Sequence, residues 1–170
     1  MSDAGVVAPL DPERMLTTLM RHQVRMVLIG ALAARLQGFP RLTLDADITP
    51  ARDAENLDRL AAALRELDAR VFTESIPEGL PFDCSAATLR RADIWNLITN
   101  AGRLDLAFQP SGTTGYDDLA ASAIPFEVYG GKLLVASLPD ILRSKEAAGR
   151  PKDRHDALLI RELIRRSRET

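Results

Sequence analysis

The sequence is poor in the residues that disulfide bonds, zinc sites and histidine catalysis require. Its 170 residues contain one cysteine, Cys84, and two histidines, His22 and His155. A single cysteine cannot form an internal disulfide bond, which is typical of proteins in a reducing compartment. We therefore expect a cytoplasmic protein with neither a disulfide nor a zinc site, and nothing in the sequence supports histidine-based catalysis.

Long apolar runs and aromatic residues are scarce as well. No apolar run approaches the ~20 residues of a membrane helix. The N-terminal segment MSDAGVVAPLDPER lacks the basic stretch and the apolar core of a signal peptide. We expect no signal peptide and no membrane partner. Aromatic residues make up 5% of the chain, too few for a broad surface that stacks single-stranded nucleic acid. We place four of them in the core: Phe82, Trp95, Phe108 and Phe126.

Charge is nearly balanced over the whole chain but is unevenly distributed along it. The formal net charge is −2, yet nine Lys or Arg stand against four Asp or Glu between Arg143 and Arg168. A basic segment in an otherwise acidic chain suits a site that binds phosphate groups, although a solvated helical face would show the same bias. The length predicts a single domain over residues 1–170, with residues 1–10 as a loose tail.

The most informative stretch runs from Met26 to Ile48. An apolar strand over 25–29 leads into Gly30-Ala31 and a short helix to about Gln37, which Gly38 and Pro40 end. Residues 41–48 then alternate between polar and apolar, the pattern of a half-buried strand. One face would carry Arg41, Thr43, Asp45 and Asp47, and the other Leu42, Leu44, Ala46 and Ile48.

Asp45 and Asp47 would lie side by side, with Cα atoms roughly 6.5 Å apart along the strand. Two such carboxylates repel each other unless a cation joins them, and a hard divalent ion such as Mg²⁺ prefers oxygen ligands of this kind. A second strand over 103–108 alternates in the same way and puts Asp105 on its polar face. If the two strands pair, the three carboxylates converge on one site that can hold two metal ions.

Further helices and turns are predicted from caps and spacing. Asp11-Pro12 begins a helix to about Arg21, and Asp53 caps a second helix that buries Leu57 and Leu64. We expect a loop with at most one short strand over 71–91, a strand over 95–97 and a helix over 116–122. A hairpin follows over 125–129 and 132–136, with Gly130-Gly131 as its turn.

Two helices complete the chain. Ser137 caps the first, which Gly149 ends, and Pro151 opens the second.

The glycine turn followed one strand later by Asp-x-Asp resembles the polymerase-β-like nucleotidyltransferase superfamily, and within it the AbiEii-type toxins of type IV toxin–antitoxin systems. The C-terminal run Gly149-Arg-Pro-Lys-Asp-Arg-His-Asp156, with Lys145 before it, resembles the signature at the end of that family's domain. The resemblance covers roughly residues 25–160. It implies the α/β minimal nucleotidyltransferase fold, a small mixed sheet flanked by helices and followed by C-terminal helices.

The resemblance also implies roles for individual residues. Asp45, Asp47 and Asp105 would be the catalytic and metal-binding residues, with Mg²⁺ or Mn²⁺ as cofactor. Ala31 departs from the Gly-Gly or Gly-Ser of the family and lacks the hydroxyl of a serine, although its backbone N–H remains. The implied nucleotide contacts are Gly30, Ala31, Arg41, Thr43, Lys145, Arg150, Lys152 and Asp156. As an alternative, Asp153 or Asp156 would orient the basic residues or cap the last helix.

The implied reaction is transfer of a nucleoside monophosphate from an NTP to a hydroxyl of a tRNA, a protein or a small molecule. A toxin would also have a cognate antitoxin as partner. Two alternatives stay open at this point: a module that binds nucleotide without turnover, and an enzyme that modifies a small molecule such as an antibiotic. The sequence favours the chemistry and leaves the acceptor undecided.

Overall fold

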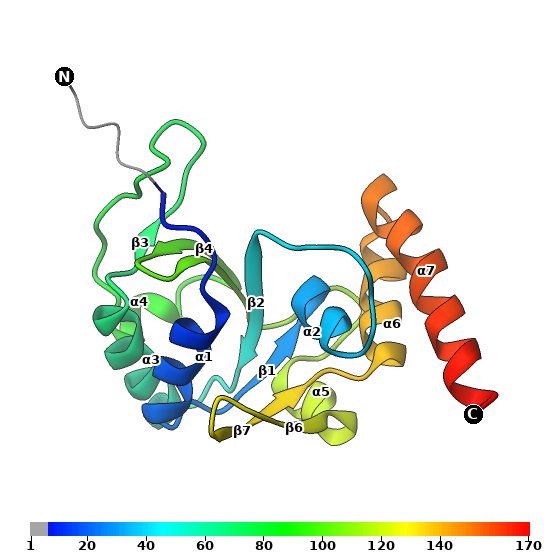
Figure 1. Ribbon diagram of the computed structural model, residues 1–170. Coiled ribbons are helices and arrows are strands. Elements are labelled where there is room, and N and C mark those ends of the chain that lie inside the picture. Colours follow the sequence, from blue (N-terminus) through cyan, green and yellow to red (C-terminus); the bar gives the residue numbers. More distant parts are fainter. Residues whose placement is uncertain (1–6) are drawn as a thin grey trace.

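A computed structural model describes residues 7–170, and its centre is one mixed sheet (Figure 1). The strand order is β3-β4-β5-β2-β1-β7-β6. Two pairs, β1 with β7 and β2 with β5, are parallel, and the other four are antiparallel. The strands are β1 (Met26–Ile29), β2 (Asp45–Pro50), β3 (Arg70–Val71), β4 (Ile94–Thr99), β5 (Gly102–Ala107), β6 (Ile124–Val128) and β7 (Gly131–Val135).

Helices flank this sheet, as predicted. They are α1 (Pro12–Arg21), α2 (Gly30–Leu36), α3 (Ala54–Glu66), α4 (Ala86–Leu89), α5 (Tyr116–Ser122), α6 (Leu138–Ala148) and α7 (Pro151–Arg168). The side chains of Asp11, Asp53 and Ser137 accept hydrogen bonds from backbone N–H groups in the first turns of α1, α3 and α6. Gly149 ends α6 with a positive φ of 65°, so the predicted starts and this stop are confirmed. No helix within residues 7–170 is long and apolar enough to cross a membrane.

Alternation in the two aspartate strands separates the core from the site. Ala46 and Ile48 of β2, and Leu104 and Leu106 of β5, are fully buried. They belong to the same hydrophobic cluster as the buried residues of α1 and α3, two helices that pack against each other. The residues between them in sequence therefore lie on the opposite face of the sheet, where the polar side chains gather. Burial of one face fixes the register of both strands, because a slip of one residue would exchange the two faces.

The strand that contains Asp45 is shorter than predicted. It begins at Asp45 rather than at Arg41, and residues 40–44 form an irregular loop after α2. Leu42 and Leu44, which we assigned to the buried face, are 74% and 85% exposed. The alternation of Arg41 to Leu44 is therefore coincidental, since no neighbouring strand pairs with those residues.

Two other segments also differ from the prediction. The expected short strand, β3, begins at Arg70, one residue before the predicted loop over 71–91. That segment also contains the helix α4, capped by Ser85. The loose tail predicted for residues 1–10 lies partly outside the described residues. Within them, Leu10 packs closely against Gly102, and the N–H of Asp11 donates to Ala101 O at 2.9 Å.

The β6–β7 hairpin is present, but its turn lies one residue earlier than predicted. Val128 pairs with Gly131, so Tyr129 and Gly130 are the two turn residues. Both have positive φ, 50° for Tyr129 and 74° for Gly130, the combination of a type I′ turn. Two adjacent glycines suggested the turn, yet the pairing of the strands places a tyrosine in the left-handed region.

Tyr129→Asn is expected to stabilise the protein by about 0.5–1 kcal/mol, because asparagine tolerates the left-handed conformation that the turn requires. Tyr129 is 46% exposed, so little packing is lost. Urea unfolding monitored by circular dichroism would measure the change. Tyr129→Val is the control and should destabilise the protein, because a β-branched residue is strained at positive φ. An asparagine variant no more stable than the wild type would contradict this account of the turn.

Candidate active site

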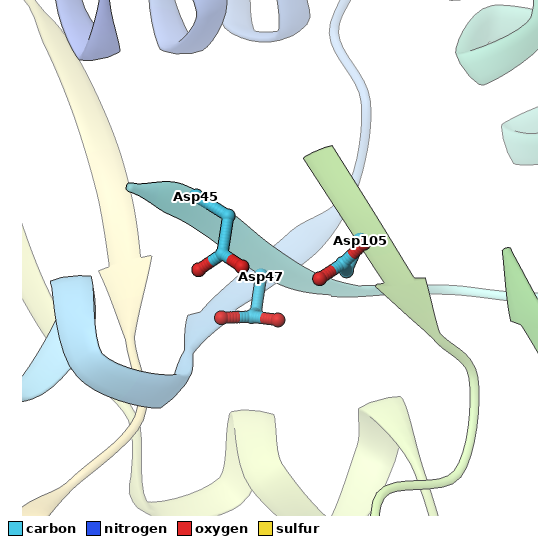
Figure 2. Close-up of side chains that lie close together, drawn as sticks. All are labelled: Asp45, Asp47 and Asp105. Atoms are coloured by element: carbon cyan, nitrogen blue, oxygen red, sulfur yellow. The ribbon is translucent and has the colours of Figure 1, made fainter. Parts of the chain in front are cut away.

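Three aspartates from two neighbouring strands meet on the polar face of the sheet (Figure 2). Parallel pairing of β2 and β5 puts Asp47 directly beside Asp105, and Asp45 projects from the same face of β2. Each residue offers one carboxylate oxygen, and the three oxygens lie within 4.8 Å of one another. The predicted convergence of the three carboxylates is confirmed. We call these three residues the aspartate cluster.

The aspartate cluster fits a divalent metal ion. Its donors are hard carboxylate oxygens, the ligands that Mg²⁺ and Mn²⁺ prefer. Asp105 Oδ1 is buried, and no group within residues 7–170 donates a hydrogen bond to it. A buried carboxylate oxygen without a partner is costly in a folded protein, and a cation would supply the missing interaction.

Crowding of the three carboxylates changes their acidity. Burial, followed by the negative charges of Asp45 and Asp105, raises the pKa of Asp47 from its ordinary 3.8 to about 7, although Lys145 and Lys152 act in the opposite direction. Burial and then the charge of Asp45 raise the pKa of Asp105 to about 6, against the effect of Arg103. Without a cation, the cluster therefore holds protons near neutral pH.

Gly30 lies against the cluster, at a position that has no room for a side chain. It opens α2 with a φ of 69°, and a Cβ atom built on it would lie 2.6 Å from Asp47 Oδ2. A side chain here would be strained by the backbone and would collide with the carboxylate. The glycine in the predicted turn is thus explained by its close contact with Asp47.

A cleft extends from the aspartate cluster to the C-terminal helices. Its lining includes Gly30, Ala31 and Thr43 on the cluster side, and Lys145 of α6 on the opposite side. Arg150, at the junction of α6 and α7, and two residues in the first turn of α7, Lys152 and Asp153, complete the opposite side. The cleft thus places three carboxylates opposite three basic side chains.

Comparison by sequence finds no match, whereas comparison by structure finds similar proteins. Neither a protein-family model nor a curated protein matches this sequence. By structure, the chain is similar to the lincosamide antibiotic adenylyltransferase LnuA in its lincomycin-bound form. The TM-score is 0.56 at 12% identity, over 91% of this chain and 99% of that one.

Two further solved structures are similar. A candidate nucleotidyltransferase of Thermotoga maritima has a TM-score of 0.52 at 18% identity, over 94% of this chain and 97% of that one. ANT(2″)-Ia in complex with adenylyl-2″-tobramycin has a TM-score of 0.50 at 18% identity, over 92% of this chain and 95% of that one. The chain has the nucleotidyltransferase fold.

In this nucleotidyltransferase fold, a buried ion-pair network holds the lysine of the cleft. Lys145 Nζ donates to Asp156 Oδ2 at 3.2 Å and lies 3.8 Å from Asp153 Oδ1, and the lysine side chain is 12% exposed. Arg41 Nη1 lies 2.8 Å from the other oxygen of Asp156, without the direction of a hydrogen bond. A lysine restrained in this way lines the cleft and has two N–H donors besides the one that Asp156 accepts.

This network changes the roles predicted for Asp156 and Arg41. The side chain of Asp156 is completely buried, so it cannot reach a ligand, and Arg41 contacts Asp156 rather than lining the cleft. The burial of Asp156 favours its alternative role, that of orienting the basic residues, over a direct nucleotide contact. Arg41 ties the loop before β2 to α7 through the same carboxylate.

The other predicted residues lie at the cleft. Thr43 Oγ1 donates to Asp45 Oδ1 at 3.0 Å, so this threonine orients a carboxylate while it lines the cleft. Arg150 is 74% exposed and donates to Asp153 at 2.6 Å, and Lys152 is exposed at the rim.

One residue beside the cluster escaped the sequence analysis. Arg103 precedes Asp105 by two positions in β5, and its Nη2 lies 3.8 Å from Asp105 Oδ1. The alternation that placed Asp105 on the polar face placed Arg103 there as well, so the signal was present in the sequence.

The pKa of Asp47 leads to a pH-dependent difference between the wild type and Asp47→Asn. Because folding raises this pKa, ionisation of Asp47 disfavours the folded state, so the cost is absent below pH ~4, grows up to pH ~7 and is constant above it. We expect metal-free Asp47→Asn to exceed the wild type in stability by on the order of 2 kcal/mol at pH 8, allowing for the partial exposure of the cluster. Thermal unfolding in a chelator at several pH values would measure this.

The matched control is Asp58→Asn, since Asp58 is exposed on α3. The difference in stability between Asp58→Asn and the wild type should be the same at every pH from 4 to 8. A stability difference for Asp47→Asn that stays flat from pH 4 to pH 8 would contradict the assigned origin of the shift. Mg²⁺ should make the wild type more stable than it is without metal, because an ion that binds only the folded state favours that state. The same ion should stabilise Asp47→Asn by a smaller amount.

Proposed function

We propose that this protein is a metal-dependent nucleotidyltransferase that moves a nucleoside monophosphate from an NTP to a hydroxyl group. The observation that carries the proposal is a single cleft with the three clustered carboxylates on one side and the basic residues of α6 and α7 on the other. Nucleotidyl transfer needs mainly positioning and charge neutralisation, which these side chains supply.

In the proposed reaction, the acceptor oxygen bonds to the α-phosphorus of the NTP while the bond from that phosphorus to the pyrophosphate oxygen breaks. The hydroxyl proton passes to Asp105, the member of the cluster on the separate strand. Asp45, Asp47 and Asp105 would hold Mg²⁺ or Mn²⁺, which when bound neutralises phosphate charge and makes the hydroxyl more acidic.

The basic residues would bind the triphosphate. Lys145 is the best placed, because the buried carboxylate of Asp156 fixes its ammonium group at the cleft. Arg150 and Lys152 are exposed at the rim and can turn toward phosphate oxygens. The backbone N–H groups at Gly30 and Ala31 would add donors without a side-chain hydroxyl. Arg41 would act indirectly, through its contact with the oxygen of Asp156 that does not accept from Lys145.

Two acceptor classes remain as proposals, each with its own support. A tRNA or protein acceptor, a toxin role and an antitoxin partner rest on the resemblance of the Gly–Asp-x-Asp and Lys–Arg-Pro-Lys-Asp segments to AbiEii-type toxins. A small-molecule acceptor is supported by the similar structures, one bound to lincomycin and one to adenylyl-2″-tobramycin. The reaction at the cleft is the same in both.

The first experiment incubates the protein with each α-³²P-labelled NTP, Mg²⁺ and total bacterial RNA, and in parallel with bacterial protein, lincomycin or tobramycin. We expect label to enter one of these acceptors. Asp45→Ala, Asp47→Ala and Asp105→Ala should each lower the rate about 100-fold or more, because each removes a charged group positioned at the reacting centre.

Asp58→Ala is the control and should keep full activity, since Asp58 is exposed on α3. Full activity in any one variant of the aspartate cluster would remove that residue from the metal site. Metal-dependent NTP binding without labelling of any acceptor would favour a binding module. Labelled RNA should bind more weakly as salt increases, because binding releases condensed counterions.

Lys145→Ala is expected to weaken NTP binding about tenfold, the equivalent of losing one charge-assisted hydrogen bond. Calorimetric titration with a non-hydrolysable NTP and Mg²⁺ would measure the affinity. Lys132→Ala is the control, because Lys132 is exposed on β7 and does not line the cleft. An unchanged affinity in Lys145→Ala would assign the lysine to the packing of α6 and α7 alone.

A further inference from the structure

The two sides of the aspartate cluster differ in what borders them. All the basic residues that line the cleft come from α6, α7 and the junction between them. On the other side, Asp105 pairs with Asn96 of β4, and Ile94, two residues earlier in that strand, lies on the same face. Asn96 is exposed and Ile94 is 62% exposed. The sheet is therefore open to solvent beside Asp105, on the side away from the residues proposed to bind the triphosphate.

Arg103 is the cationic residue of this open side that lies next to the cluster. It sits opposite Asp45 in the β2–β5 pairing, and its guanidinium carbon lies 4.1 Å from the centre of the Phe72 ring. The N–H of Phe72 donates to Asn96 O at 2.9 Å, which fixes the start of the loop after β3 beside β4. The ring and Asp105 thus hold the guanidinium from two directions.

The structure shows no hydrogen bond from Arg103 to another side chain or to the backbone within residues 7–170. No group within residues 7–170 accepts a hydrogen bond from its Nε, which is buried, and the 3.8 Å separation of Nη2 from Asp105 Oδ1 exceeds hydrogen-bonding distance. Leaving a buried donor unpaired costs about 1–3 kcal/mol. A guanidinium that is positioned by other contacts, on a side chain that is 32% exposed, is arranged to bind oxygen atoms of a ligand.

The direction of the reaction indicates which ligand this is. Attack on the α-phosphorus is in line with the departing pyrophosphate, so the acceptor must come from the side opposite Lys145 and Arg150. That side is the open face of β4 and β5. A guanidinium recognises phosphate and carboxylate groups with two parallel hydrogen bonds, and it repels an ammonium group. It would also offset the repulsion between the aspartate cluster and an anionic acceptor.

Building on the proposed function, we propose that Arg103 recognises the acceptor, and that the acceptor carries a phosphate or carboxylate close to its reacting hydroxyl. Phe72 is the positioning residue that holds the guanidinium in place. The anionic group could belong to the 3′ end of an RNA or to a small phosphorylated molecule. Both present the same chemistry to Arg103, and the probes below separate them.

The test follows the Arg103 Nε–H signal by nuclear magnetic resonance in ¹⁵N-labelled protein that is first saturated with a non-hydrolysable NTP and Mg²⁺. The signal is assigned by its loss in Arg103→Lys. The probes are ribose 5-phosphate, the dinucleotide ApA, which carries one phosphate, and uncharged ribose. We expect a saturable shift with the two phosphate-bearing probes and none with ribose.

Arg103→Gln should weaken binding of ribose 5-phosphate at least about tenfold, the loss of one charged contact, and should change NTP affinity by a smaller factor. Phe72→Leu should weaken the same binding by a smaller factor. Arg52→Gln is the matched control, because Arg52 also lies over an aromatic ring, that of Phe108, but donates its hydrogen bonds to Asp93 and two backbone carbonyls. It should bind the probes like the wild type.

The outcomes separate this inference from the function on which it rests. Failure of the wild type to bind NTP with Mg²⁺ would overturn the proposed function and the inference with it. Two results would overturn the inference alone, provided that the wild type binds NTP normally. One is an Arg103 signal that does not shift with either phosphate-bearing probe. The other is an affinity for ribose 5-phosphate in Arg103→Gln that equals that of the wild type. Tighter binding of ApA than of ribose 5-phosphate would identify an RNA end as the source of the anionic group, and the reverse order a small phosphorylated molecule.

Discussion

The architecture of the site depends on the repulsion between three carboxylates that the sheet forces together. Parallel pairing of β2 and β5 fixes Asp47 beside Asp105, and the strand geometry keeps Asp45 on the same face. The neighbouring residues respond to that concentration of negative charge. Gly30 leaves room for Asp47, Thr43 donates a hydrogen bond to Asp45, and Arg103 approaches Asp105. Burial first, and then the uncompensated part of this repulsion, raise the pKa values of Asp47 and Asp105.

A second electrostatic arrangement connects the cluster to the C-terminal helices. Asp156 is buried in α7 and contacts Lys145 of α6 and Arg41 of the loop before β2. A buried charge of this kind is tolerated only when it is paired, so the carboxylate brings three chain segments to one point. The result is a lysine restrained at the cleft and a loop attached to α7 just before the strand that contains Asp45. The network thus links the position of the basic side of the cleft to that of the acidic side.

The fold is similar to that of proteins with which the chain shares 12–18% of its residues, and no family model matches the sequence. The same fold can form at such low sequence identity because it imposes few constraints on the sequence. The fold needs apolar residues of suitable size on the buried face of the strands, which many sequences supply, whereas the site needs particular residues at few positions. Under the proposed function, acceptor recognition would not be among the shared constraints. It would depend on side chains such as Arg103 at the open side of the sheet, where each chain can differ.

The sequence by itself determined the elements whose signals are local. Caps at Asp11, Asp53 and Ser137, the stop at Gly149 and the alternation around Asp105 each depend on a few adjacent residues, and the structure agrees with them. Tertiary structure alone decided which strands pair, and therefore that the loop before β2 is irregular with Leu42 and Leu44 exposed, that Tyr129 occupies the hairpin turn, and that Asp156 is buried behind Lys145. Those outcomes depend on residues far apart in the chain, because burial and pairing are properties of the packed molecule and not of any short segment.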